Sequence, residues 1–192
     1  LDLHLPGEGT HQRSYDILGA HERTVDGVDG VSFAVWSPNA RSVAVVGDFN
    51  SWNPGSHPMS RVRHSNIWAL FVPGLSEGAL YKYAVLGCDD QMRMKADPYA
   101  FAAEVRPKTA SRVARLDDYG WGDSNWMVQR RQVDPLVKPI SVYEVHLGSW
   151  KRGGANGDEF LSYRELARQI VAYCKEMGYT HVELMPVMEH PL

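Results

Sequence analysis

Apolar and polar residues alternate in four short runs between Gly30 and Leu86. A period of two is typical of half-buried strands in an antiparallel sheet. Clusters of Gly, Pro, Asn and Ser separate the runs and supply the preset or positive φ angles that tight turns require. The pattern predicts a β-sandwich with short connections, and its strands are expected at residues 31–36, 42–46, 67–72 and 80–86.

After Phe101 the alternation is lost, and a charged and polar stretch without a sustained apolar period runs to Pro139. Such a stretch indicates a connector that lies over the surface. Beyond it, residues 140–147 and 180–187 are rich in apolar and β-branched side chains, as is typical of buried parallel strands. We therefore expect three parts, which are a sandwich at 1–110, a connector at 111–139 and a strand–helix–strand segment at 140–192.

The segment between these two strands carries complete signals for a helix. Ser162 is placed to act as the N-cap with Glu165 as its capping-box partner, and Leu161 can pack against Leu166 as a staple. Gly178 stands where a left-handed residue commonly ends a helix. A strand, a helix and a parallel strand form a right-handed crossover, which doubly wound sheets and closed barrels share, so the pattern alone leaves both open. One helical face would carry Leu166, Ile170, Tyr173, Cys174 and Met177.

Charge and cysteine content exclude several classes of function. The formal net charge is −3 with both signs mixed along the chain, so there is no broad basic face and we expect no nucleic-acid partner. No segment approaches the ~20 apolar residues of a bilayer span, so we expect no membrane partner. Cys88 and Cys174 form no CxxC pair, which argues against a zinc site and against a disulfide framework.

The first residues carry no basic stretch followed by an apolar core, so a secretory signal is not expected. Two reduced thiols fit a cytoplasmic location. The chain starts with Leu1 instead of Met, which favours a fragment or a processed form.

The sequence lacks the motifs of nucleotide and metal chemistry. GxGxxG, GxxxxGK[ST] and HExxH are absent, so we expect neither a cofactor nor a metal. Hydrogen-bonded structural roles are expected for three histidines, His146, His181 and His190. Carboxylates near the C-terminal ends of parallel strands point toward the mouth where α/β active sites lie. For three such residues an ion pair or a supporting role is still favoured over catalysis, namely Glu144, Glu183 and Glu189.

Several runs of the sequence resemble bacterial glycogen branching enzymes. The first strand, first helix and second strand of their catalytic barrel are similar to residues 143–150 (Tyr-Glu-Val-His-Leu-Gly-Ser-Trp), 161–167 and 177–191. The glucan-associated module that precedes this barrel is similar to residues 47–53 (Gly-Asp-Phe-Asn-Ser-Trp-Asn), 57–59, 80–83 and 95–101. The matches cover nearly the whole chain in the right order.

The resemblance implies an immunoglobulin-like β-sandwich followed by the first βαβ unit of a TIM (β/α)8 barrel. It implies an enzyme of the α-amylase superfamily that cleaves an α-1,4-glucan and transfers the chain to a 6-hydroxyl. Such retaining chemistry needs two carboxyl groups ~5 Å apart, which in this family come from later barrel strands. No catalytic residue is therefore expected in this chain, which alone should be inactive. Its expected partners are glycogen or amylose and the remainder of the barrel.

The resemblance also implies a glucan-binding site. In related glycogen-binding modules, the tryptophan of an Asn-x-Trp turn and the lysine of a Tyr-Lys-Tyr strand contact glucan. These two residues match Trp52 and Lys82. An exposed indole can cover the apolar face of a glucose ring while an ammonium donates to hydroxyls. A second tryptophan of the family is replaced here by the stretch Gln91-Met92-Arg93. The alternative is that Trp52 packs beneath its own loop and Lys82 only solvates a sheet face.

Other glucan-active proteins share parts of this pattern. Debranching enzymes and trehalose-releasing hydrolases have the same module and barrel. The amino-acid sequences of residues 146–150 and 187–191 nevertheless favour a branching enzyme. A non-catalytic glucan-binding subunit would share the features of residues 47–52 and 81–83, yet it would have no reason to carry residues 140–187. Because two strands cannot close a barrel, we expect apolar positions of that segment to face open space.

Overall fold

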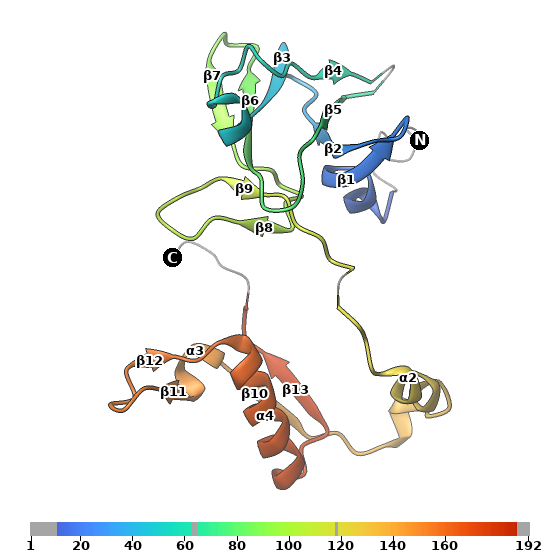
Figure 1. Cartoon of the computed structure of the whole chain (residues 1–192). Helices are drawn as coiled ribbons and strands as arrows, with labels where there is room; N and C mark the ends of the chain where they lie inside the picture. Colours follow the sequence, from blue (N-terminus) through green and yellow to red (C-terminus); the bar gives the residue numbers. More distant parts are fainter. Residues whose placement is uncertain (1–10, 63–64, 118, 188–192) are drawn as a thin grey trace. The chain divides into compact units, whose positions relative to one another are not determined.

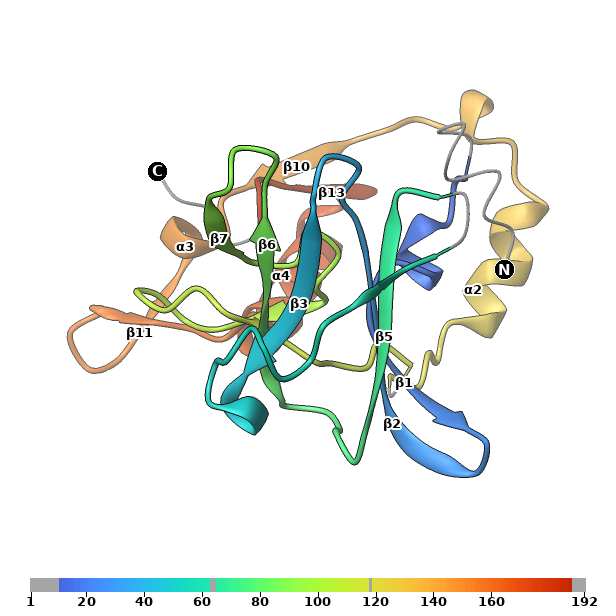
Figure 2. The same ribbon diagram turned by 90° about the horizontal axis from the view of Figure 1, so that it is seen from above.

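The computed structural model describes residues 11–62, 65–117 and 119–187. The chain divides into two compact units, Leu1–Gly120 and Trp121–Leu192. Each unit is described by itself below (Figures 1 and 2).

The first unit is a β-sandwich of two antiparallel sheets, as the alternation predicted. One sheet has the order β1-β2-β5-β4, with β1 spanning Gly19–Val25, β2 Val28–Trp36, β5 Ile67–Pro73 and β4 Ser60–Arg61. The other has the order β3-β6-β9-β8, with β7 also on β6, where β3 spans Ser42–Gly47, β6 Leu80–Leu86, β9 Ser111–Arg112, β8 Ala102–Ala103 and β7 Met92–Lys95. Two short 3-10 helices, η1 (Ser14–Asp16) and η2 (Asp48–Asn50), complete the unit.

The core of the sandwich lies between the inward faces of the two sheets. Alternate residues of β2, β3, β5 and β6 meet there, as expected of half-buried strands. The cluster includes Val31, Phe33, Val35, Val43, Val45, Trp68, Val72, Tyr81 and Tyr83. A second, smaller cluster of Ala44, Val46 and Ala84 lies on the outer face of β3 and β6. Both faces of this strand pair are therefore covered.

A buried carboxylate ties the chain after β7 to the centre of β6. Asp97 is 6% exposed and accepts hydrogen bonds from the hydroxyls of Tyr81 (2.6 Å) and Tyr83 (3.2 Å) and from the Tyr99 N–H (2.8 Å). The Ser111 hydroxyl accepts from the Asp97 N–H at 2.8 Å. Burial raises the pKa of Asp97, although these hydrogen bonds oppose that shift. The segment between β7 and β9 is thus fixed to the sheet.

The second unit contains a parallel strand pair with a crossover helix. β10 (Val142–Val145) pairs with β13 (His181–Leu184), and α4 (Tyr163–Met177) connects them in sequence. Val145, Ile170 and Cys174 are buried against a layer of partly buried aromatic side chains that includes Tyr143, Tyr173 and Tyr179. The remaining elements are α2 (Ser124–Arg131), η3 (Pro135–Val137), α3 (Leu147–Trp150), β11 (Arg152–Gly153) and β12 (Glu159–Phe160).

The capping signals at both ends of α4 are confirmed. The Ser162 hydroxyl accepts from the Glu165 N–H, and the Glu165 carboxylate accepts from the Ser162 N–H at 2.9 Å. Gly178 follows with a φ of 77° and ends the helix. Met177, the last residue of the helix, is 57% exposed. The chain turns at Gly178 and places Tyr179, the next aromatic residue, on the cluster instead.

The second unit contains two α-helices that the sequence did not predict, α2 and α3. Helix α2 forms within the stretch that lacks an apolar period, and none of its described residues is buried. Because this helix buries no face, its sequence has no apolar residues at helical spacing.

No helix in the described part of the chain is both long and apolar enough to cross a bilayer.

The strands of the second unit expose apolar side chains. Val142, Val182 and Leu184 are 50%, 42% and 49% exposed, although parallel strands ordinarily lie buried on both faces. Among the described residues, β10 and β13 pair only with each other. The expectation that apolar positions of this segment face open space is confirmed for these residues.

The first prediction concerns Asp97 and pH. Because its pKa is raised in the folded state, the stability contributed by this carboxyl is full below its ordinary pKa of 3.8 and is lost as pH rises through the folded value. Asn does not titrate. The unfolding free energy of the wild type minus that of Asp97→Asn should therefore fall as the pH rises above the ordinary pKa of 3.8, as measured by urea denaturation. Asp26→Asn controls for the loss of one exposed charge, and a difference that grows with pH would contradict the prediction.

Candidate functional site

The loop after β3 is held by one asparagine side chain. Asn50 Oδ1 accepts from the Gly47 N–H at 3.0 Å, and Asn50 Nδ2 donates to the Val45 carbonyl at 3.0 Å. The same Nδ2 lies 2.9 Å from His57 Nδ1. These contacts join the end of β3, the turn and the chain that returns past it, so the loop has a defined shape.

The loop ends in two consecutive left-handed residues. Ser51 has a φ of 53° and Trp52 has a φ of 59°. For a bulky side chain this conformation costs roughly 1 kcal/mol or more. The Trp52 N–H donates to the Gly47 carbonyl at 2.9 Å, which helps to hold the strained backbone.

The indole of Trp52 lies on the outer face of the sheet. It packs against the cluster of Ala44, Val46 and Ala84, and its Nε1 donates to Asp48 Oδ1 at 2.8 Å. The side chain is half-buried. One part of the ring thus covers the sheet while the rest meets solvent, so the structure combines features of the binding alternative and the packing alternative.

Lys82 lies on the same face as Trp52. In the register of β3 and β6, Val46 is directly opposite Lys82, and opposite residues project to the same side of a sheet. Trp52 packs on the cluster that contains Val46, so both predicted residues lie on the face that carries this cluster. The Lys82 ammonium donates to the Thr109 hydroxyl at 2.7 Å, which orients it along the face.

Two methionines extend this outer face. Strand β7 places Met94 opposite Ala84 and Met92 opposite Leu86, and the two side chains are 46% and 49% exposed. Methionine is apolar and adaptable, so it can contact an irregular apolar surface. From the sequence, this stretch was expected only to lack the second tryptophan of the family. The Met-x-Met alternation of residues 92–94 was the signal that could have placed both methionines beside Lys82.

Two of the candidate histidines of the second unit make hydrogen-bonding contacts with neighbouring hydroxyls. His146 Nδ1 lies 2.8 Å from the Ser149 hydroxyl, and His181 Nδ1 lies 2.8 Å from the Thr180 hydroxyl, in accord with the hydrogen-bonded roles expected for them. Glu144 and Glu183 lie opposite each other in the β10–β13 register and are exposed. Glu189 and His190 lie outside the described residues. Within the described ranges no group of three or more His, Cys, Asp or Glu side chains could hold a metal ion.

A Gly-x-Ser-x-Gly sequence at residues 74–78 does not form a nucleophile elbow. Such an elbow joins a strand to a helix, whereas these residues connect the strands β5 and β6. The ring of the nearby His21 has its Nε2 3.0 Å from the Leu18 carbonyl. The sequence match therefore indicates a glycine-rich turn.

Residues 17–100 match the family model of carbohydrate-binding module 48, described as the isoamylase N-terminal domain. Over the whole chain, the 1,4-alpha-glucan branching enzyme GlgB of Thermosynechococcus vestitus is 53% identical, and that of Rhodospirillum rubrum is 54% identical. This chain is homologous to branching enzymes. It spans only 28% and 26% of the length of these two curated relatives.

Solved structures with the same fold are more distant in sequence than the branching enzymes. A putative alpha amylase from Salmonella typhimurium aligns over 92% of this chain and 26% of its own, with a TM-score of 0.61 and 22% identity. A Klebsiella pneumoniae pullulanase complexed with maltotriose aligns over 95% of this chain and 19% of its own, with a TM-score of 0.61 and 22% identity. At this identity the likeness shows the fold alone.

The second prediction concerns the loop of this branching-enzyme homologue. Asn50→Ala should lower the free energy of unfolding by about 2 kcal/mol, because it leaves the Gly47 N–H and the Val45 carbonyl without the amide partner. Asn53→Ala is the matched control, since Asn53 makes an exposed contact to the Gly55 N–H in the same loop. Chemical denaturation of both variants tests this, and equal losses would show that Asn50 does not hold the loop.

Proposed function

We propose that this chain is the N-terminal part of a 1,4-alpha-glucan branching enzyme of glycogen biosynthesis. The parent would cleave an α-1,4-glucan and transfer the released chain to a 6-hydroxyl. The supporting observation is the identity of about half over the entire chain to curated branching enzymes. The alternatives, a debranching enzyme, a trehalose-releasing hydrolase or a non-catalytic glucan-binding subunit, have weaker support. A cytoplasmic location is part of the same proposal.

We propose that residues 140–192 begin the catalytic barrel, that residues 1–110 form the glucan-associated module and that 111–139 connect them. The parallel register of β10 and β13 with α4 between them supports the barrel assignment. So does the exposure of Val142, Val182 and Leu184, which later strands of a barrel would cover. The catalytic carboxylates would then come from residues beyond this chain.

We propose that the outer face of β3, β6 and β7 binds α-glucan through Trp52 and Lys82. The exposed part of the indole provides an apolar surface for a sugar ring, and the ammonium can donate to its hydroxyls. Asp48 positions the indole and Thr109 positions the ammonium through the hydrogen bonds described above. Met94 provides further apolar contact at the position opposite Ala84. A glucan bound there would contact side chains that already have fixed orientations.

The third prediction tests the branching assignment. The isolated chain should not change the iodine staining of amylose, because two barrel strands cannot assemble the carboxylate pair of a retaining glycosidase. A chimera in which this chain replaces the matching segment of the Thermosynechococcus vestitus enzyme should branch amylose. The control is the same enzyme with that segment deleted. A folded chimera without activity would contradict the assignment, as would activity of the isolated chain.

The fourth prediction tests the glucan face. Trp52→Ala should weaken the affinity of this face for maltoheptaose by about fivefold to tenfold, since one aromatic contact contributes on the order of 1 kcal/mol. Lys82→Ala should weaken it by about threefold to fivefold through the loss of one hydrogen bond. Trp36→Ala, which removes an exposed tryptophan from β2, should leave it unchanged. Titration calorimetry measures these affinities, and an unchanged Trp52→Ala affinity would mean that the indole serves only packing.

A further inference from the structure

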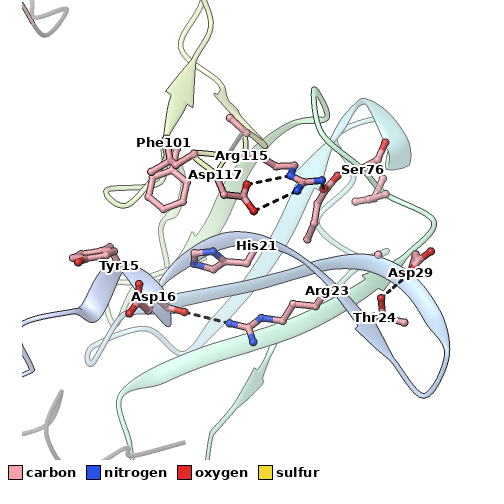
Figure 3. Close-up of a pocket in the computed structure, with 15 residues that line it drawn as sticks. Tyr15, Asp16, His21, Arg23, Thr24, Asp29, Ser76, Phe101, Arg115 and Asp117 are labelled. Atoms are coloured by element: carbon pink, nitrogen blue, oxygen red, sulfur yellow. Dashed lines mark hydrogen bonds and ion pairs between the residues drawn. The ribbon is translucent and has the colours of Figure 1, made fainter. Parts of the chain in front are cut away.

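A groove of about 900 Å³ runs beside β1 at the open edge of the sandwich. β1 is the end strand of its sheet, so one of its edges has no neighbouring strand among the described residues. The opposite wall comes from the segment after β9, which carries Arg115 and Asp117. Figure 3 shows Tyr15 and Phe101 toward one end of the groove and Thr24 and Asp29 toward the other. The lining contains none of the residues of the Trp52 face.

Aromatic surface is present at one end of this groove. Tyr15 is 45% exposed, and Phe101 is held edge-on to the ring of His21 with the centroids 5.6 Å apart. A partly exposed aromatic ring offers a flat apolar face to a ligand, and a ring fixed by its neighbours loses little freedom on contact.

The polar groups of the groove are already held in position. The Arg115 guanidinium lies 3.2 Å from an Asp117 carboxylate oxygen and 3.8 Å from Glu22, whose other oxygen accepts from the Glu77 N–H at 2.6 Å. The hydrogen bond from Arg115 lowers the pKa of Asp117 and so keeps that carboxylate an acceptor. Carboxylate acceptors beside guanidinium donors can together form hydrogen bonds with a series of hydroxyl groups.

The charge of the groove excludes anionic ligands. Four carboxylates and two guanidinium groups line it, so the net charge is −2 with histidine neutral. Phosphates and nucleic acid would be repelled. A neutral polyhydroxyl chain fits both the fixed hydrogen-bonding groups and the aromatic end.

We propose that this groove is a second glucan-binding site of the sandwich, separate from the face that carries Trp52 and Lys82. The sugar class follows from the lining, and the α-1,4 linkage rests on the proposed function. Two sites on one module would engage two stretches of a branched polymer at once. The second contact would then be intramolecular, which raises the affinity for glycogen above that for a short oligosaccharide.

The test is a titration of the ¹⁵N-labelled 192-residue Trp52→Ala variant with maltoheptaose, followed by amide NMR. Amides of residues 21–24 and 114–117 should shift in a saturable way, and additional Tyr15→Ala should raise the fitted Kd at least about fivefold. Additional Trp36→Ala, the matched control, should leave that Kd unchanged. Asp117→Ala gives a second probe, because it removes an exposed acceptor at the opposite wall and should also raise the Kd.

The outcomes separate this proposal from the earlier one. If wild-type amides near residues 52 and 82 respond while those of the groove do not, the groove proposal is overturned and the Trp52 face stands. If neither set responds, both binding proposals are overturned. If calcium chloride shifts the groove amides and maltoheptaose does not, the groove binds a cation and the proposal is wrong. An unchanged Kd after Tyr15→Ala would likewise overturn the proposed stacking site.

Discussion

The hydrogen bonds from Tyr81 and Tyr83 to Asp97 determine how the sandwich presents its surfaces. They hold two residues of β6 on the inner side of the sheet, where both hydroxyls meet one buried carboxylate. Because side chains alternate along a strand, Lys82 and Ala84 must then face outward. The same carboxylate accepts from the Tyr99 N–H and so fixes the chain that leads to Phe101 in the groove. Both proposed sites thus depend on one buried acceptor.

Local patterns were sufficient to predict the strands β2, β3, β5 and β6 of the sandwich and the strand–helix–strand segment of the second unit. Alternation identified β2, β3, β5 and β6 but missed β1, which is as long as β5 and β6. The Ser162–Glu165 capping box with Gly178 identified both ends of α4. These signals lie within a few residues of one another, so the sequence shows them directly. Helix α2 left no such signal because none of its described residues is buried.

The candidate sites were harder to predict because they depend on tertiary contacts. The resemblance identified Trp52 and Lys82, but only the register of β3 and β6 together with the packing of the indole shows that both lie on one face. Met94 reaches the same face through pairing between β6 and β7. The groove brings together Tyr15, Phe101 and Arg115, which are far apart in the sequence and lie on segments without a shared pattern. Periodicity describes one helix or strand at a time, so it cannot show which distant residues line the same groove.

The left-handed backbone at Trp52 has a consequence for molecular recognition. A flexible aromatic residue at a surface loses rotamer and loop freedom when a ligand immobilises it, at a cost of about 0.5–1.5 kcal/mol per side chain. Here the φ of 59°, the contact of the indole Nε1 with Asp48 and the packing on the outer cluster of the sheet impose that order in the absence of a ligand. The rotamer and loop entropy of Trp52 is therefore lost when the sandwich folds. Binding of a ligand does not have to reduce it further.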